Sequence, residues 1–205
     1  MNRDASAHVT RGHGLLEGFL ARRRARRANR LIRPEVRGGR ILDVGCGSYP
    51  LFLSRTTFAE KFGIDQVAED THFNDPALKG ITVAKFDVEE DGKFPFDDGF
   101  FDVVTALAVF EHIEPQRLVS LLSEVRRVLA PGGQVIMTTP APWTGGILTL
   151  MAKLRLVSAV EIEEHEGAYS RAAIHTTLRD AGFHPDKIRS GYFELLMNTW
   201  CCAVK

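Results

Sequence analysis

The sequence predicts an α/β protein built around a mainly parallel β-sheet. Short apolar runs alternate with amphipathic helical segments along most of the 205 residues, a pattern typical of parallel strands joined by helices. One apolar run ends in a glycine turn, within GGRILDVGCGSYPLFL at residues 38–53. Two closely spaced strand patterns near the C-terminus predict an antiparallel hairpin that closes the sheet.

The first forty residues are strongly basic. They contain eleven arginines and three acids, a net charge of +8 in a chain whose formal net charge is zero. Apolar residues near helical spacing between Leu15 and Ile32 predict an amphipathic helix. We therefore divide the chain into a basic helical arm, 1–38, and a main domain, 39–205.

This basic arm has several interpretations. A solvated basic helix is one, and an electrostatic contact with a membrane surface, a phosphorylated substrate or RNA is another. A third is a cap that lies across the domain and shapes its substrate site, because the rest of the chain is acidic. The hypothesis carried forward is the cap, with weak lipid contact as a secondary role.

The main domain shows a regular order of elements. Strands are predicted at Arg40–Val44, Lys61–Asp65, Ile81–Phe86, 100–110, Gln134–Thr139, Phe183–Ser190 and Phe193–Val204. Helices are predicted at Pro50–Thr57, Pro115–Leu129 and Tyr169–Ala181. A short Gly191–Tyr192 connection is expected between the last two strands. Ser48 is expected to cap the helix that Pro50 begins.

Three successive predicted strands end in aspartate, at Asp43, Asp65 and Asp87. Since the carboxyl ends of parallel strands meet at one edge of a sheet, these carboxylates should converge beside the glycine turn. A carboxylate there can accept both hydroxyls of a ribose. Asp43 would oppose a phosphate but suits a cationic ligand, which disfavours a nicotinamide dinucleotide.

Five segments, ILDVGCGS, FGIDQ, KFDVEE, FDVVTALAVFEHI and EVRRVLAPGGQVIMTTP, together resemble the motifs of class I S-adenosylmethionine-dependent methyltransferases. Their order and spacing resemble the subgroup that includes ubiquinone and menaquinone methyltransferases. The resemblance covers residues 30–140 and, more weakly, 165–205. It implies a Rossmann-like, doubly wound sheet of seven strands, mostly parallel with an antiparallel last strand. It also implies S-adenosylmethionine as cofactor.

Transferred by position, the resemblance implies a set of cofactor-binding residues. They are Asp43, Gly45 and Gly47 around the methionine portion, Asp65 at the ribose, Asp87 and Val88 at the adenine, and Ala106 and Leu107 at the amino-acid end. Cys46, Tyr49 and Gln66 complete the set. Tyr49 occupies the position of the family's third glycine, and its ring is predicted to lie beside the cofactor or in the acceptor pocket.

Methyl transfer is an in-line displacement at an activated carbon, so positioning and a dry site supply much of the catalysis. A base is needed only if the acceptor must lose a proton. The candidates are His112, His165 and Tyr169, each with local packing or capping as the alternative, whereas Glu111 is assigned a structural role. Residues 141–169 are predicted to form an acceptor-side insertion or lid, and their acids match no closed metal-ligand set.

The sequence thus predicts methyl transfer from S-adenosylmethionine to a small-molecule or lipid- or saccharide-linked acceptor. The alternatives are a non-catalytic cofactor-binding or interaction module, and an RNA methyltransferase, which the acidic body does not fit. No stable nucleic-acid partner is expected. Three cysteines without a disulfide framework and no apolar signal core predict a cytoplasmic protein, with peripheral contact at the inner membrane face through the basic helix.

Overall fold

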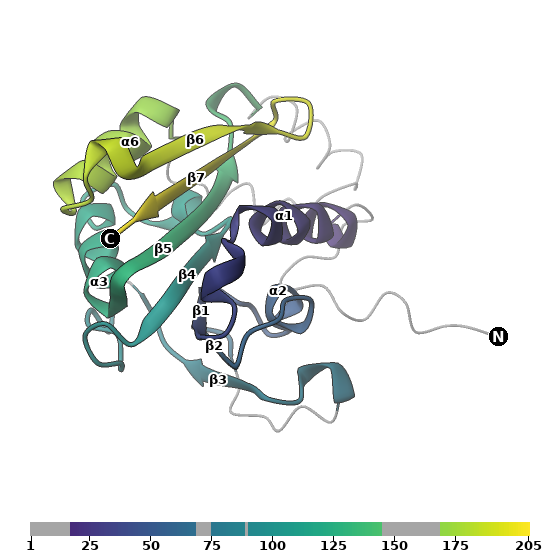
Figure 1. Cartoon of the computed structure of the whole chain (residues 1–205). Coiled ribbons are helices and arrows are strands. Elements are labelled where there is room, and N and C mark those ends of the chain that lie inside the picture. The colour runs from purple at the N-terminus through teal and green to yellow at the C-terminus, as the bar shows by residue number, and fades with distance from the viewer. Residues whose placement is uncertain (1–16, 69–74, 89, 145–168) are drawn as a thin grey trace.

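The computed structural model describes residues 17–68, 75–88, 90–144 and 169–205, and these form a seven-stranded sheet (Figure 1). The strand order is β3-β2-β1-β4-β5-β7-β6. The strands are β1 (Arg40–Val44), β2 (Glu60–Asp65), β3 (Ile81–Lys85), β4 (Phe101–Leu107), β5 (Leu129–Pro140), β6 (Ile188–Phe193) and β7 (Asn198–Val204). Strands β1 to β5 pair in parallel, and β7 is antiparallel to both of its neighbours. The predicted fold class is confirmed.

Helices cover both faces of this sheet (Figure 1). They are α1 (Glu17–Leu31), α2 (Leu51–Ser54), α3 (Leu118–Val128) and α6 (Arg171–Asp180). The helices α1 and α2 pack on one face and α3 and α6 on the other, because the side chains of each strand alternate between two separate core clusters. Within the described ranges, no helix has the length and apolar character that a membrane crossing requires.

The basic helix α1 is part of the folded core. Ala25, Ala28 and Ile32 are buried together with Val103 of β4 and Ile136 of β5. Their spacing places them on one side of the helix, and the small alanines allow a close approach to the sheet. Four of the α1 arginines, Arg22, Arg23, Arg26 and Arg30, are exposed, whereas Arg27 stacks over the ring of Trp200 on β7 at 4.6 Å.

The connection between the last two strands differs from the prediction. Gly191–Tyr192 lies inside β6 rather than in a turn. Glycine is required at position 191 because a Cβ there would lie 2.7 Å from Nε1 of Trp200. The turn comes later, where Glu194, Leu195 and Leu196 have φ values of 53°, 54° and 70°. A glycine that accommodates a neighbouring ring was thus mistaken for a turn glycine.

Two predicted helix starts were also wrong. The helix α3 begins after Pro115, which lies in a turn. Pro50 precedes α2 with φ −75° and ψ 67°, and the amide of Leu51 donates to the carbonyl of Tyr49 at 2.7 Å. This is the geometry of a tight three-residue turn. Ser48 is exposed, and the N-cap position of α2 is Pro50, which makes no side-chain cap hydrogen bond within the described part of the chain.

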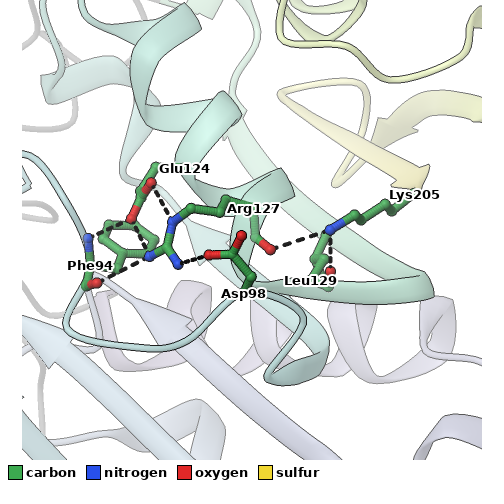
Figure 2. Close-up of polar contacts among 6 residues, drawn as sticks. All are labelled: Phe94, Asp98, Glu124, Arg127, Leu129 and Lys205. Carbon is green, nitrogen blue, oxygen red and sulfur yellow. Dashed lines mark hydrogen bonds and ion pairs between the residues drawn. The ribbon is translucent and has the colours of Figure 1, made fainter.

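A polar network at the amino edge of the sheet joins α3 to the chain around it (Figure 2). The Arg127 guanidinium donates to Glu124 at 2.6 and 2.9 Å, to Asp98 at 2.6 Å and to the carbonyl of Phe94 at 3.1 Å. Lys205 Nζ donates to two carbonyls at the junction of α3 and β5. Burial works to raise the pKa of Glu124, but hydrogen bonds from Arg127 and the Phe94 amide hold it below its usual range.

Replacing Arg127 with leucine is expected to lower the free energy of unfolding by about 2–4 kcal/mol, because Glu124 would be left inside without its cation. The lowered pKa of Glu124 stabilises the fold above the usual value of 4.5, and this contribution is lost as the pH falls through the folded value. The difference between the two proteins in urea denaturation should therefore shrink in acid. The control is Arg117→Leu, which removes a half-exposed pair with Glu114 and should cost less than about 1 kcal/mol. Equal losses in the two variants would contradict the prediction.

Candidate functional site

The glycine turn after β1 lies at the carboxyl edge of the parallel strands. Gly45 and Gly47 both have φ of 73°. The Gly45 amide donates to the carbonyl of Ile64 at 2.8 Å, which holds the turn against the end of β2. A Cβ on Gly45 would lie 2.4 Å from Cγ2 of Val109, just after β4. Position 45 therefore needs glycine both for its left-handed backbone and for this close approach.

Two of the three predicted aspartates are buried beside the turn. Asp43 Oδ1 accepts a hydrogen bond from the Thr105 hydroxyl at 2.6 Å. The Asp65 carboxylate accepts from the amides of Gly47 at 2.8 Å and Val67 at 3.0 Å. Asp65 thus ties the glycine turn to the end of β2. The partner Thr105 was missed from the sequence, where it lies unmarked within an apolar strand.

The pKa of Asp43 is raised to about 7: burial is the main cause, the hydrogen bond from Thr105 opposes the shift, and the charge of Asp65 adds to it. Two carboxyl groups close together in a buried place disfavour ionisation of one of them. A cationic group placed here would relieve this repulsion. Strongly shifted groups of this kind are typical of functional sites.

The variant Asp43→Asn is expected to remove a pH dependence of stability. Since the pKa of Asp43 is higher in the folded protein, about 7, than its ordinary 3.8, the folded state holds the proton more tightly. Stability due to Asp43 is greatest in acid and is lost as the pH rises toward the folded value, by up to about 1.4 kcal/mol per unit. Denaturation of ligand-free wild type and variant at about pH 5 and about pH 8 measures how the free energy of unfolding changes with pH. Parallel changes in wild type and variant would contradict the assignment.

The third aspartate, Asp87, follows β3 and is half-buried. Its Oδ1 accepts from the Glu90 amide at 3.3 Å, and its own amide donates to Asp91 at 2.8 Å. Val88 packs against the main core cluster, so its backbone is held in place after β3. Gln66, which follows β2, is exposed.

The structure connects the side chain of Tyr49 to the loop after β2. Its hydroxyl donates to Asp75 Oδ2 at 3.0 Å, while Asp75 Oδ1 accepts from the Ala77 amide at 2.8 Å. One carboxylate oxygen of Asp75 thereby caps the short 3-10 helix Pro76–Leu78, and the other binds the hydroxyl of Tyr49. Cys46 is buried and faces Gly63 of β2, where a Cβ would meet its sulfur at 2.7 Å.

The end of β4 makes an abrupt turn at the same edge. After Ala106 and Leu107 the chain turns at Ala108, which has φ of 61° and donates its amide to the carbonyl of Thr138 at 2.9 Å. A left-handed alanine costs about 1–2 kcal/mol. Strain of this kind concentrates where a fold positions functional groups.

Two of the three candidate bases lie together at this edge. His112 is half-buried in the 3-10 helix Phe110–His112 that follows β4. The hydroxyl of Tyr169 donates to the carbonyl of Ile113 at 3.1 Å, and Ile113 directly follows His112 in the chain. His165 and most of the predicted insertion, 145–168, lie outside the described residues. Within the described ranges, no three potential ligands gather as a metal site.

Glu111 is a further candidate that sequence reasoning set aside. It is 2% exposed and precedes His112 in the same short helix. Among the residues that the structure describes, its Oε2 has no hydrogen-bond partner. A buried carboxylate oxygen without a donor is costly, so this atom marks a place where a bound molecule could donate.

The fold and this edge define the class of protein: an α/β protein whose parallel strands end in a glycine turn and carboxylates. A model of the methyltransferase domain family matches residues 16–188, which include α1. The chain therefore belongs to the methyltransferase domain family. Its fold is that of class I S-adenosylmethionine-dependent methyltransferases, as the motifs predicted.

Curated relatives match part of the chain. Tocopherol O-methyltransferase from Arabidopsis thaliana is 32% identical over 108 residues, which are 49% of this chain and 30% of the relative. Ubiquinone/menaquinone biosynthesis C-methyltransferase UbiE from Burkholderia mallei is 31% identical over 124 residues, 56% of this chain and 49% of the relative. The chain thus spans half or less of the length of these relatives.

Solved structures show the same fold. An S-adenosylmethionine-dependent methyltransferase from Mesorhizobium loti has a TM-score of 0.66 and 18% identity, covering 89% of this chain and 98% of that one. Phosphoethanolamine N-methyltransferase 2 from Haemonchus contortus, in complex with S-adenosyl-L-methionine, has a TM-score of 0.64 and 17% identity, covering 89% and 52%. At these identities the likeness is one of fold alone.

Proposed function

We propose that this methyltransferase acts on a small-molecule or lipid-linked acceptor, and that the carboxyl edge of β1 to β4 holds its cofactor. The observation that carries the proposal is the arrangement of Asp43, Gly45 and Asp65 around one turn. The turn amides and two buried carboxylates offer contacts for a ligand that carries both hydroxyls and positive charge. A pyrophosphate would be repelled there.

The residues present fit S-adenosylmethionine. Asp43, whose pKa burial raises, would be stabilised in its ionised form by the positively charged methionine end. Asp65 can accept ribose hydroxyls while it keeps its two backbone contacts, because a carboxylate has roughly four acceptor sites. Asp87 and the backbone of Val88 would contact the adenine edge after β3, beside Gln66 after β2.

The bound cofactor supplies a methyl group on a positively charged sulfur, so the chain mainly has to orient the acceptor and exclude water. Glu111 would accept a hydrogen bond from the acceptor or the cofactor through Oε2. A ring nitrogen of His112 would take the proton where the acceptor is a hydroxyl. Tyr169, fixed to the carbonyl of Ile113, would border the same place.

The names of the relatives support the lipid-linked part of the proposal. They specify tocopherol, ubiquinone and menaquinone, which are ring compounds with a long hydrocarbon chain. The match to UbiE, together with the order of the motifs, supports placement in the ubiquinone and menaquinone subgroup. The neighbouring phosphoethanolamine enzyme carries out N-methylation, so the fold by itself does not select an acceptor. The cytoplasmic location stays a prediction from composition.

Binding and turnover test the proposal separately. Calorimetry with S-adenosylhomocysteine is expected to show one binding event in the folded protein. Mass spectrometry should then detect methyl transfer to at least one member of a panel containing soluble phenols, lipid-linked quinols and total RNA. Transfer to RNA alone would replace the proposed acceptor class. Cofactor binding without any transfer would favour a non-catalytic cofactor-binding module, and absence of binding would contradict the site.

A further inference from the structure

The turn between β6 and β7 places two leucines in solvent. Leu195 is 92% exposed and Leu196 is 58% exposed. With Glu194 they form three consecutive residues with left-handed φ values of 53°, 54° and 70°. This backbone is unfavourable for side chains other than asparagine, aspartate or glycine. Two large apolar side chains held outward on such a turn indicate an interaction surface.

This turn lies at the same edge of the sheet as the glycine turn. Pro140 at the end of β5 pairs with Asn198 at the start of β7, so the turn extends beyond the carboxyl ends of the parallel strands (Figure 1). The Ala141 amide donates to the carbonyl of Met197 at 2.8 Å. Trp143, two residues further along, is another of the exposed large apolar side chains.

The helix α1 is fixed against this turn. Arg23 Nε donates to Glu194 Oε1 at 3.1 Å, and Asn198 Nδ2 donates to Glu194 Oε2 at 2.6 Å. The Glu194 side chain is only 7% exposed. A carboxylate with two partners on two elements holds the leucines in a fixed position beside the N-terminal half of α1.

The exposed side of α1 is basic. The helix contains six arginines and a single acid, Glu17. Phe19, Arg22 and Arg26 recur every three or four residues along the helix and are exposed. The aromatic ring of Phe19 lies toward the same end of the helix that contacts the turn.

We propose that these elements form a docking surface for an anionic lipid bilayer, made up of Phe19, Arg22, Arg26, Trp143, Leu195 and Leu196. The leucines and aromatic rings would enter the headgroup region while the arginines remain level with the phosphates. An RNA surface is disfavoured, because leucine side chains neither stack on bases nor pair with phosphates. The inference goes beyond the proposed function, since it requires no particular acceptor.

Docking through this surface would orient the cofactor and acceptor site toward the bilayer. Since the surface and the glycine turn share one edge of the sheet, the bilayer would lie beside the place where cofactor and acceptor meet. A lipid-linked acceptor would then reach the edge without leaving the membrane. The cap hypothesis for the basic arm changes accordingly: α1 packs on the sheet through its alanines and leaves Arg22 and Arg26 exposed.

Co-sedimentation of the full chain with vesicles tests this surface without any cofactor. The protein is expected to pellet with vesicles of phosphatidylcholine and phosphatidylglycerol, to stay in solution with phosphatidylcholine alone, and to dissociate as salt increases. The double variant Arg22→Gln/Arg26→Gln should weaken partitioning about 25-fold, since each cation contributes about a factor of five. Arg179→Gln/Arg189→Gln removes the same charge from exposed positions elsewhere and should bind like wild type.

The leucines are tested by Leu195→Asn/Leu196→Asn. Asparagine tolerates the left-handed backbone, so this variant should unfold at the same temperature as wild type or higher. Its partitioning should fall roughly ten-fold, because the buried apolar area is lost. Unchanged partitioning of this variant, or equal binding to neutral and anionic vesicles, would overturn the proposal. RNA binding that depends on Arg22 and Arg26 but not on the leucines would replace the bilayer with RNA as partner.

Discussion

Replacing Asp65 with alanine is expected to weaken binding of S-adenosylhomocysteine by about 1.5–3 kcal/mol, the scale of a hydrogen bond to a charged group. Two effects act together. The ribose hydroxyls lose their acceptor, and the amides of Gly47 and Val67 lose the carboxylate that holds the turn. Calorimetric titration of wild type and variant measures the loss.

The two effects can be separated. Leaving the two amides without a partner should also lower the free energy of unfolding by about 1–3 kcal/mol in ligand-free protein. Asp65→Asn keeps one acceptor oxygen for the turn but removes the charge, so it should recover part of the stability and little of the affinity. The control is Asp186→Ala, an exposed carboxylate near His184 and outside the proposed site, which should change neither affinity nor stability. Equal titrations of wild type and Asp65→Ala would remove this residue from the site.

The variant Gly45→Ala is expected to lower the free energy of unfolding by about 2–4 kcal/mol and to abolish measurable cofactor binding. The left-handed backbone accounts for about 1–2 kcal/mol. The rest comes from overpacking, because the new Cβ would lie 2.4 Å from Cγ2 of Val109. Either β4 or the glycine turn must then move away from the edge.

A matched control distinguishes backbone strain from overpacking. Gly80 has φ of 79°, but no atom of the residues that the structure describes lies within 4 Å of its would-be Cβ, so Gly80→Ala should show the backbone cost alone. The double variant Gly45→Ala/Val109→Ala removes the clashing methyl and should recover the overpacking part. Chemical denaturation of the four proteins gives both differences. Similar losses in Gly45→Ala and Gly80→Ala would show that the contact with Val109 is unimportant.

Local patterns were sufficient for most elements of the sheet. β1 was predicted at Arg40–Val44, as observed. β2 begins at Glu60, one residue before its predicted start. These strands are short apolar runs bounded by glycine or charge, so hydrophobic period and turn chemistry determine them locally. The strand β5 begins at Leu129, five residues before its predicted start, because that residue already pairs with Phe101 across a register shift.

The predictions about the last strands depended on contacts that are distant in sequence, and there they failed. Gly191 is glycine because of Trp200 on the paired strand, and nothing in its immediate neighbours distinguishes it from a turn residue. The true turn contains no glycine at all, so propensity alone argues against it. Its position follows from the pairing of β6 with β7.

The sequence alone determined the class of fold, the glycine turn, and three carboxylates at successive strand ends, because each depends on residues close together in the chain. Only the tertiary structure decided what these groups contact. Thr105 opposite Asp43 and Asp75 opposite Tyr49 are separated from their partners by tens of residues. Arg23 and Glu194 lie 171 residues apart, yet they join α1 to the last turn. The free energy of such pairs depends on the packing of the whole sheet, which no local pattern encodes.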